Sequence, residues 1–184
     1  MGEWGICNYQ PYWNTLAVEL LSLLEKMSWA KLKVKSMWSL WDCESNEWFN
    51  DAPVVICTPE NQLEFCATKL NEFSISLNSI SLSIPVYWCG NEDPDTKPLY
   101  WKPQQNPEFS DLAGKSIVGI EIVEFCLDKE VHTFLGLEKW LLSGIALQLE
   151  DERLEILNGL DCNTLSRSQR SEEWSRYIQV MNHY

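Results

Sequence analysis

The side chains whose types could most readily take part in a reaction form a short corner, Asp161-Cys162-Asn163. This corner follows two apolar runs separated by a polar turn. A carboxylate and a thiol side by side suggest acid–base or nucleophilic chemistry. Asp and Asn side chains also accept hydrogen bonds from backbone N–H groups two residues further on, and so close turns. Asn71 likewise follows the returning strand in the first half of the chain. One turn-forming residue in each half favours a structural role for Asp161.

Other groups that carry catalysis are sparse. The histidines His132 and His183 have no ligand-spaced partner, which argues against a transition-metal site. The chain contains no glycine-rich phosphate-binding motif and no G-x-S-x-G nucleophile motif. Glu121 and Glu124 lie on an expected strand, where a buried pair of carboxylates would have a raised pKa. We therefore predict no catalytic residue, no metal and no cofactor.

The cysteines indicate the cellular compartment. There are seven, with no C-x-x-C pair, so neither a disulfide framework nor a zinc site is indicated. Several lie in apolar runs, where cysteine packs as a small hydrophobic residue. The first residues lack the basic and apolar segments of a signal peptide. No apolar run reaches the roughly 18 residues that span a bilayer. We expect a cytoplasmic protein without membrane contact.

The charge of the chain limits its partners. A formal net charge of −13 repels nucleic acids and attracts basic proteins. Surface acids that serve only solubility are the alternative interpretation. Because 45% of the residues are hydrophobic and ten are Trp, the chain has ample material for a folded core.

Hydrophobic periodicity predicts the elements that position these residues. Residues 14–27 carry a helical apolar stripe, with Asn14 as N-cap. Residues 31–40 alternate lysines with apolar side chains, which predicts an edge strand. Residues 54–66 form a hairpin around the turn Thr58-Pro59-Glu60-Asn61, because Pro59 presets φ at the second turn position. Residues 111–125 predict a strand that is buried on both faces.

Two segments of the second half are harder to interpret. Residues 127–144 suggest a loop and a short helix that ends at Gly144. Residues 171–181 place four apolar or aromatic side chains on one helical face: Trp174, Tyr177, Ile178 and Met181. The corresponding region of the first half predicts a strand, so both alternatives stay open for residues 171–181.

Residues 54–72 align with residues 145–163 without a gap. Leu63 meets Leu154, Glu64 meets Glu155, and both segments predict a strand, a polar turn and a returning strand. Internal duplication is the favoured interpretation, and generic hairpin patterning is the alternative. The predicted fold is α+β and β-rich, with antiparallel sheets and a few short helices, and a duplication would divide it into two similar lobes. The halves are residues 1–91, with the N-terminal helix, and residues 111–184.

A connecting loop rich in proline and aromatic residues, residues 92–110, joins the two halves. A purely flexible linker would carry fewer aromatic side chains. Either this region packs across both lobes, which we favour, or it presents an aromatic and acidic patch to a partner.

The stretch from Gly144 to Asn163 resembles a hairpin of bacterial immunity proteins in polymorphic and contact-dependent toxin systems. There, two apolar strands flank an acidic turn and lead into Asn-x-Leu-Asp-Glu-Asn. Cys162 stands where that motif commonly has Glu. The resemblance implies a cytoplasmic, acidic inhibitor that binds its cognate toxin domain directly.

An acidic protein gains association rate from opposite charge and affinity from aromatic anchors. The first partner-binding candidates are in and beside the connecting loop: Trp88, Glu92, Asp93, Asp95, Tyr100 and Trp101. The second candidates form the turn of the later hairpin: Glu150, Asp151 and Glu152. Two other functions stay open. One is a hydrolase with a carboxylate-lined pocket between two β lobes, and the other is an assembly protein built as a pseudo-dimer.

Overall fold

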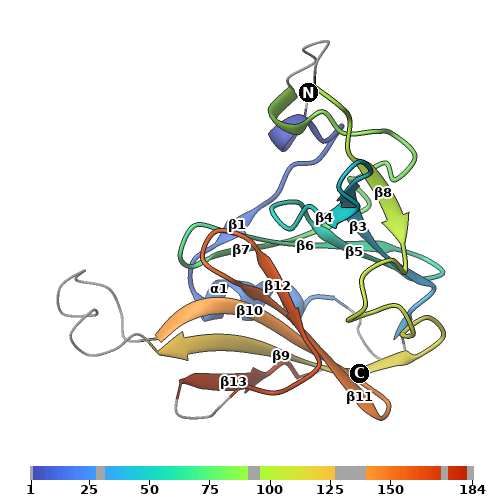
Figure 1. Cartoon of the computed structure of the whole chain (residues 1–184). Coiled ribbons are helices and arrows are strands. Elements are labelled where there is room, and N and C mark those ends of the chain that lie inside the picture. Colours follow the sequence, from blue (N-terminus) through green and yellow to red (C-terminus); the bar gives the residue numbers. More distant parts are fainter. Residues whose placement is uncertain (1, 28–31, 91–95, 127–139, 171–173, 182–184) are drawn as a thin grey trace.

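Two antiparallel sheets lie face to face, and one helix covers an open side between them (Figure 1). The computed structural model describes residues 2–27, 32–90, 96–126, 140–170 and 174–181. Within these residues, every strand pair is antiparallel. The predicted β-rich α+β fold is therefore confirmed.

The first sheet is built from the first 103 residues. Its order is β1 (Trp13–Asn14), β7 (Glu72–Leu77), β6 (Gln62–Thr68), β5 (Val54–Cys57), β3 (Ser36–Asp42) and β4 (Glu47–Trp48). Strand β8 (Tyr100–Pro103) also pairs with β3, so part of the predicted connecting loop belongs to this sheet.

The second sheet comes mainly from the second half of the chain. Its order is β12 (Asn163–Ser166), β11 (Glu152–Asn158), β10 (Trp140–Leu149), β9 (Ser116–Cys126) and β13 (Ser175–Gln179). The short strand β2 (Leu32–Lys33) pairs with β9, and the chain then crosses to the first sheet through β3. The predicted lysine-rich strand is therefore split between the two sheets.

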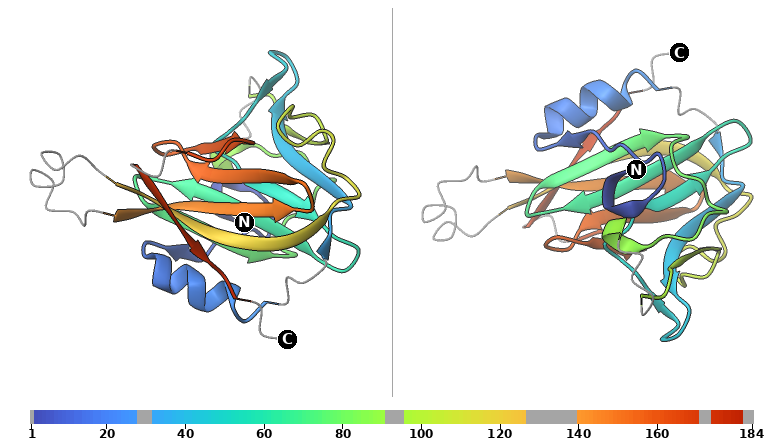
Figure 2. Two further views of the ribbon diagram at one scale, coloured as in Figure 1. Left: turned by 90° about the horizontal axis from the view of Figure 1, so that it is seen from below. Right: turned by 90° about the horizontal axis from the view of Figure 1, so that it is seen from above.

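Period-two alternation places one face of each sheet in a shared apolar core. Ile56 and Phe65 from the first sheet meet Ile145 and Ile156 from the second, and all four are fully buried. Helix α1 (Ala17–Leu24) adds Leu20 to this core from beside the sheets (Figure 2). Burial of such aliphatic and aromatic side chains is the main source of folding free energy.

A second apolar cluster covers the outer face of the first sheet. Its buried members include Ile6, Tyr9, Val55, Leu99 and Trp101. The N-terminal segment with η1 (Glu3–Gly5) and the segment with η2 (Trp88–Gly90) supply much of this layer. In Figure 1 these segments form the upper part of the molecule.

The two aligned hairpins share one register. Val54 pairs with Phe65 as Ile145 pairs with Ile156. The pair Val55–Glu64 likewise matches the pair Ala146–Glu155. The offset between the hairpins equals that of the gapless sequence alignment. Duplication itself, and the division into residues 1–91, 92–110 and 111–184, stay predictions.

Asn14 does not cap the helix, contrary to the prediction. It is buried in β1, where its Nδ2 donates to the carbonyl of Phe73 at 3.1 Å. Glu19 serves the start of the helix instead, because its Oε2 accepts from the N–H groups of Thr15 at 3.0 Å and Leu16 at 3.2 Å. A long carboxylate side chain reaching back satisfies N–H groups that the helix leaves open.

Gly144 also differs from the prediction, because it lies inside β10 rather than at the end of a helix. It sits at a bulge with φ 150°, and a Cβ there would lie 2.2 Å from the carbonyl oxygen of Ile156. Residues 127–139 lie outside the described part of the chain. Residues 175–179 form strand β13, which settles the helix-or-strand alternative for them in favour of the strand.

Candidate protein-binding surfaces

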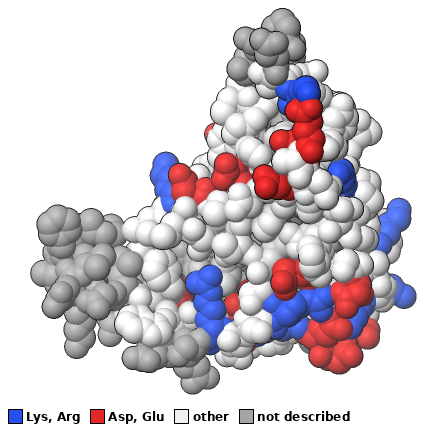
Figure 3. Space-filling view, viewed as in Figure 1, with Lys and Arg blue, Asp and Glu red and all other residues white. Residues whose placement is uncertain are grey.

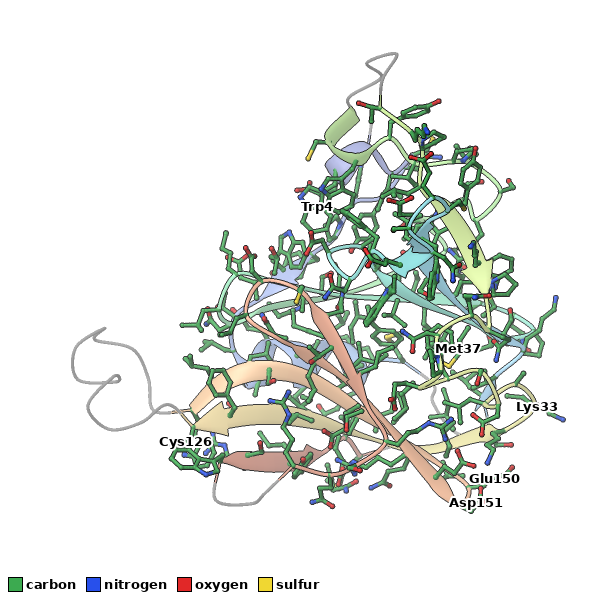
Figure 4. All side chains as sticks on the ribbon, in the orientation of Figure 1. Trp4, Lys33, Met37, Cys126, Glu150 and Asp151 are labelled. Atoms are coloured by element: carbon green, nitrogen blue, oxygen red, sulfur yellow. The ribbon has the colours of Figure 1, made fainter. Side chains whose placement is uncertain are left out.

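The tip of the β10–β11 hairpin presents the predicted acids Glu150 and Asp151 to solvent. Figure 4 shows both at the projecting end of the hairpin. Glu152 is half-buried and bonds to both Lys115 and Arg167. These basic residues tie the tip to the body of the second sheet and bring positive charge beside the acids (Figure 3).

The ion pairs at this tip shift the titration of its groups. Lys115 Nζ lies 3.2 Å from Asp151 Oδ1, and this hydrogen bond lowers the pKa of the Asp151 carboxyl. Hydrogen bonds to Glu152 and Asp151 raise the pKa of Lys115. Asp151 therefore stays charged, and its side chain is 79% exposed. Beside the tip is an open hollow of about 600 Å³ with Val118, Glu150 and Arg167 in its lining.

The predicted aromatic contacts of the central region separate into buried and exposed rings. Trp101 is only 7% exposed and packs in the second apolar cluster. Trp88 is half-buried. The centroid of its ring lies 5.3 Å from that of Trp4 and 4.7 Å from that of Phe49. Tyr100 is 43% exposed. Packing within the fold therefore buries Trp101 and much of Trp88. Of these three rings, Tyr100 is the one that a partner can reach. Glu92, Asp93 and Asp95 lie outside the described residues.

A group of acids that the sequence reasoning missed lies beside Tyr100. Tyr100 pairs with Trp41 across β8 and β3, and the β3–β4 hairpin then carries Asp42, Glu44 and Glu47. The N–H of Glu44 donates to Asp42 Oδ1 at 2.8 Å, which lowers the pKa of Asp42. The signal was present in the sequence, because three acids fall within the short polar run between two tryptophans.

Asp161 has a structural role, as expected, but its side chain joins the two halves of the chain, whereas Asn158 Oδ1 accepts the N–H groups that close the turn. Asp161 Oδ1 accepts from the N–H of Lys69 at 2.6 Å and from Thr68 Oγ1 at 3.1 Å. Asn158 Nδ2 donates to the carbonyls of Lys69 at 2.9 Å and Thr68 at 3.1 Å. The β11–β12 turn is thereby fastened to the β6–β7 turn.

The buried side chain of Asn163 also forms hydrogen bonds with the first half of the chain. Its Oδ1 accepts from the N–H of Ala67 at 2.9 Å, and its Nδ2 donates to the carbonyls of Asn50 at 3.0 Å and Ala52 at 2.9 Å. The side chain is fully buried. Cys162 is half-buried, and burial raises the pKa of its thiol, with the charges of Asp51 and Asp161 adding to the shift. The thiol is therefore a poor nucleophile.

The buried carboxylates lie on the outer faces of the sheets, away from the space between them. Glu64 accepts from the N–H groups of Ser79 at 2.7 Å and Ile80 at 2.8 Å, and from the hydroxyls of Ser76 and Ser79. On the second sheet, Arg153 bonds to Glu155 and Glu121. Each of these carboxylates is held by hydrogen bonds within the fold.

Within the part of the chain that the structure describes, no three His, Cys, Asp or Glu side chains are arranged to hold a metal ion. None of the described helices is long and apolar enough to cross a membrane. Comparisons of the chain with protein-family models, curated proteins and solved structures give no match.

Proposed function

We propose that this protein is an acidic inhibitor of the immunity type, which neutralises a basic toxin domain by binding it directly. The observation that carries the proposal is the placement of exposed carboxylates at two projecting hairpin ends. Glu44 and Glu47 are exposed on the β3–β4 hairpin beside the half-buried Asp42, and Glu150 and Asp151 are exposed on the β10–β11 hairpin. The exposed ring of Tyr100 adjoins the first group.

These features suit a partner of opposite charge. Clustered carboxylates on a protein of net charge −13 steer a basic protein inward and raise the association rate. A tyrosine supplies a large contact area with little loss of side-chain entropy, which is typical of interface anchors. The bonds from Lys115 and Arg167 to Glu152 fix the β10–β11 tip before the partner arrives, which lowers the entropy cost of binding.

The two other candidate functions have less support. A hydrolase would need a polar pocket between the sheets, but the described residues fill that space with apolar side chains such as Phe65, Leu147 and Ile156. An assembly protein would bring copies of equal negative charge together, which electrostatic repulsion opposes. A direct inhibitor needs neither a pocket nor self-association.

Affinity purification from the organism that encodes the protein tests the proposal. The wild-type protein serves as bait beside the double variant Glu150→Lys, Asp151→Lys. A matched control, Glu3→Lys, Glu60→Lys, makes the same change in net charge at exposed acids elsewhere. We expect a basic protein to be enriched by the wild type and the control but much less by the first variant. Equal recovery by all three baits would contradict the proposal.

A further inference from the structure

Four large apolar side chains are exposed at one end of the sandwich. Leu160 and Tyr12 are each 70% exposed, Val18 is 65% exposed and Leu16 is 43% exposed. Leu160 belongs to the β11–β12 turn, and the other three flank the start of α1. Contiguous exposed apolar surface is unusual on a monomer and marks interaction sites.

Hydrogen bonds connect the chain segments that carry these side chains. The N–H of Asp161 donates to the carbonyl of Lys69 at 3.1 Å, which links the β11–β12 turn to the β6–β7 turn. Asn71 Nδ2, in the β6–β7 turn, donates to the carbonyl of Thr15 at 3.3 Å, beside Leu16. The two turns lie next to each other at the left of Figure 1. Tyr12 and Val18 line a common hollow of about 500 Å³. We name this end of the molecule the turn-end surface.

Leu160 is held outward by a backbone conformation that leucine does not favour. Its φ is 68°, and Asp161 follows with φ 80°. The left-handed region is unfavourable for an L-residue with a Cβ, because the Cβ lies too close to the following carbonyl oxygen. Asn158 fixes the turn, because its Oδ1 accepts from the N–H groups of Leu160 at 3.0 Å and Asp161 at 3.1 Å. Glycine or asparagine would suit this position better for folding alone.

Asp161 directly follows the exposed leucine in the chain, and Asp51 lies near Asp161. Asp161 and Asp51 are both exposed, and the pKa of Asp51 is raised by partial burial and by the charge of Asp161. Lys69 does not cancel this charge, because its Nζ lies 2.7 Å from Glu72 Oε1 in an ion pair of its own. A second copy of the chain would bring the same carboxylates and be repelled.

We propose that the turn-end surface docks a basic protein, with Leu160 inserted in an apolar pocket of that partner and Asp51 and Asp161 facing its lysines or arginines. The inference rests on the proposed function and adds a second contact area to it. An apolar side chain with charged groups beside it matches the general plan of a protein interface, which has an apolar core and a polar rim. The bonds of Asn158 and Asp161 present that side chain without further ordering on binding.

Site-specific photo-crosslinking in the encoding organism tests the docking surface. Benzoylphenylalanine is placed singly at Leu160, Tyr100, Asp151 and Leu77. Leu77 is the control, because it is 45% exposed and lies at the other end of β7 from the β6–β7 turn. The captured protein is then purified, and its affinity is measured for the wild type, Leu160→Gly and Leu77→Ala.

The inference predicts that a basic protein is crosslinked at position 160 and not at position 77. It also predicts at least a tenfold loss of affinity in Leu160→Gly, with little change in Leu77→Ala. Because glycine suits a positive φ, Leu160→Gly should fold at least as stably as the wild type. A basic partner that crosslinks at Tyr100 or Asp151 but not at Leu160 would overturn this inference and leave the proposed function standing. The absence of any basic partner at all four positions would overturn both, and unchanged affinity of Leu160→Gly would overturn the inference alone.

Discussion

The connection between the two halves can be tested by removing the side chain of Asn163. Its amide makes one bond to the N–H of Ala67 and two to the carbonyls of Asn50 and Ala52. Ala67 and Ala52 are 1% and 0% exposed, so water cannot replace the lost partner. The variant Asn163→Ala would therefore leave two buried backbone groups without these bonds.

A buried group that loses its hydrogen-bond partner costs about 1–3 kcal/mol. With two such groups and one further lost bond, we expect Asn163→Ala to lower the free energy of unfolding by about 3–5 kcal/mol. This is a large part of the roughly 5–15 kcal/mol that stabilises a typical domain. In a chain of this size it corresponds to a fall in Tm of roughly 10 °C.

Urea unfolding followed by tryptophan fluorescence measures this loss. The control is Asn71→Ala, because Asn71 makes a single side-chain bond of 3.3 Å near the surface. We expect the control to lose less than about 1 kcal/mol. If Asn163→Ala were no less stable than Asn71→Ala, the corner would not hold the two halves together as inferred.

Three further predictions concern buried and half-buried groups. Glu64→Ala should lower the free energy of unfolding by about 2–4 kcal/mol, because two backbone N–H groups lose a common acceptor; a neutral result in urea unfolding would contradict the role given to Glu64. Asp51→Asn should raise Tm at neutral pH, because the pKa of Asp51 is raised in the folded state and the charged form opposes folding. That gain should shrink as the pH falls through the raised pKa and vanish below the usual Asp range, so a pH-independent gain would refute the assignment. Burial raises the pKa of Cys66 to about 12, so a thiol reagent at pH 8 should label the exposed Cys7 and spare Cys66 until the protein unfolds; equal labelling rates would argue against its burial.

The sequence predicted the elements whose signals are local. Alternation around the turn at Pro59 gave the hairpin of β5 and β6, and the apolar stripe gave α1. The second hairpin followed from the gapless alignment, which matches the observed register at Glu64 and Glu155. Each of these patterns depends on residues close together in the chain.

Features set by distant contacts were not predictable in the same way. Residues 174–178 fit a helical face, but pairing with β9 makes 175–179 a strand. The sequence predicts the end of a helix at Gly144. In the structure, Gly144 instead allows β10 to approach β11 closely at a bulge. Asp161 was expected to close a turn. Asn158 closes that turn, and the carboxylate of Asp161 instead accepts from the N–H of Lys69, far away in sequence, which depends on how the two sheets pack.

The candidate surface was only partly predictable for the same reason. The acids of the β10–β11 turn were identified because a hairpin turn must lie at the surface. The burial of Trp101 and the exposure of Tyr100 next to it follow from strand alternation once β8 is known to pair with β3. Leu160 carried no sequence signal, because an exposed leucine is indistinguishable from a core leucine until the turn is placed.

The salt dependence of binding tests the central claim most directly. Once the basic partner has been purified, its Kd is measured for the wild type and for Glu150→Lys, Asp151→Lys from low to high ionic strength. We expect wild-type affinity to weaken steadily with added salt, and the variant to bind more weakly at low salt with a shallower dependence. Equal affinity of both proteins at every salt concentration would show that the acidic hairpin end does not bind the partner.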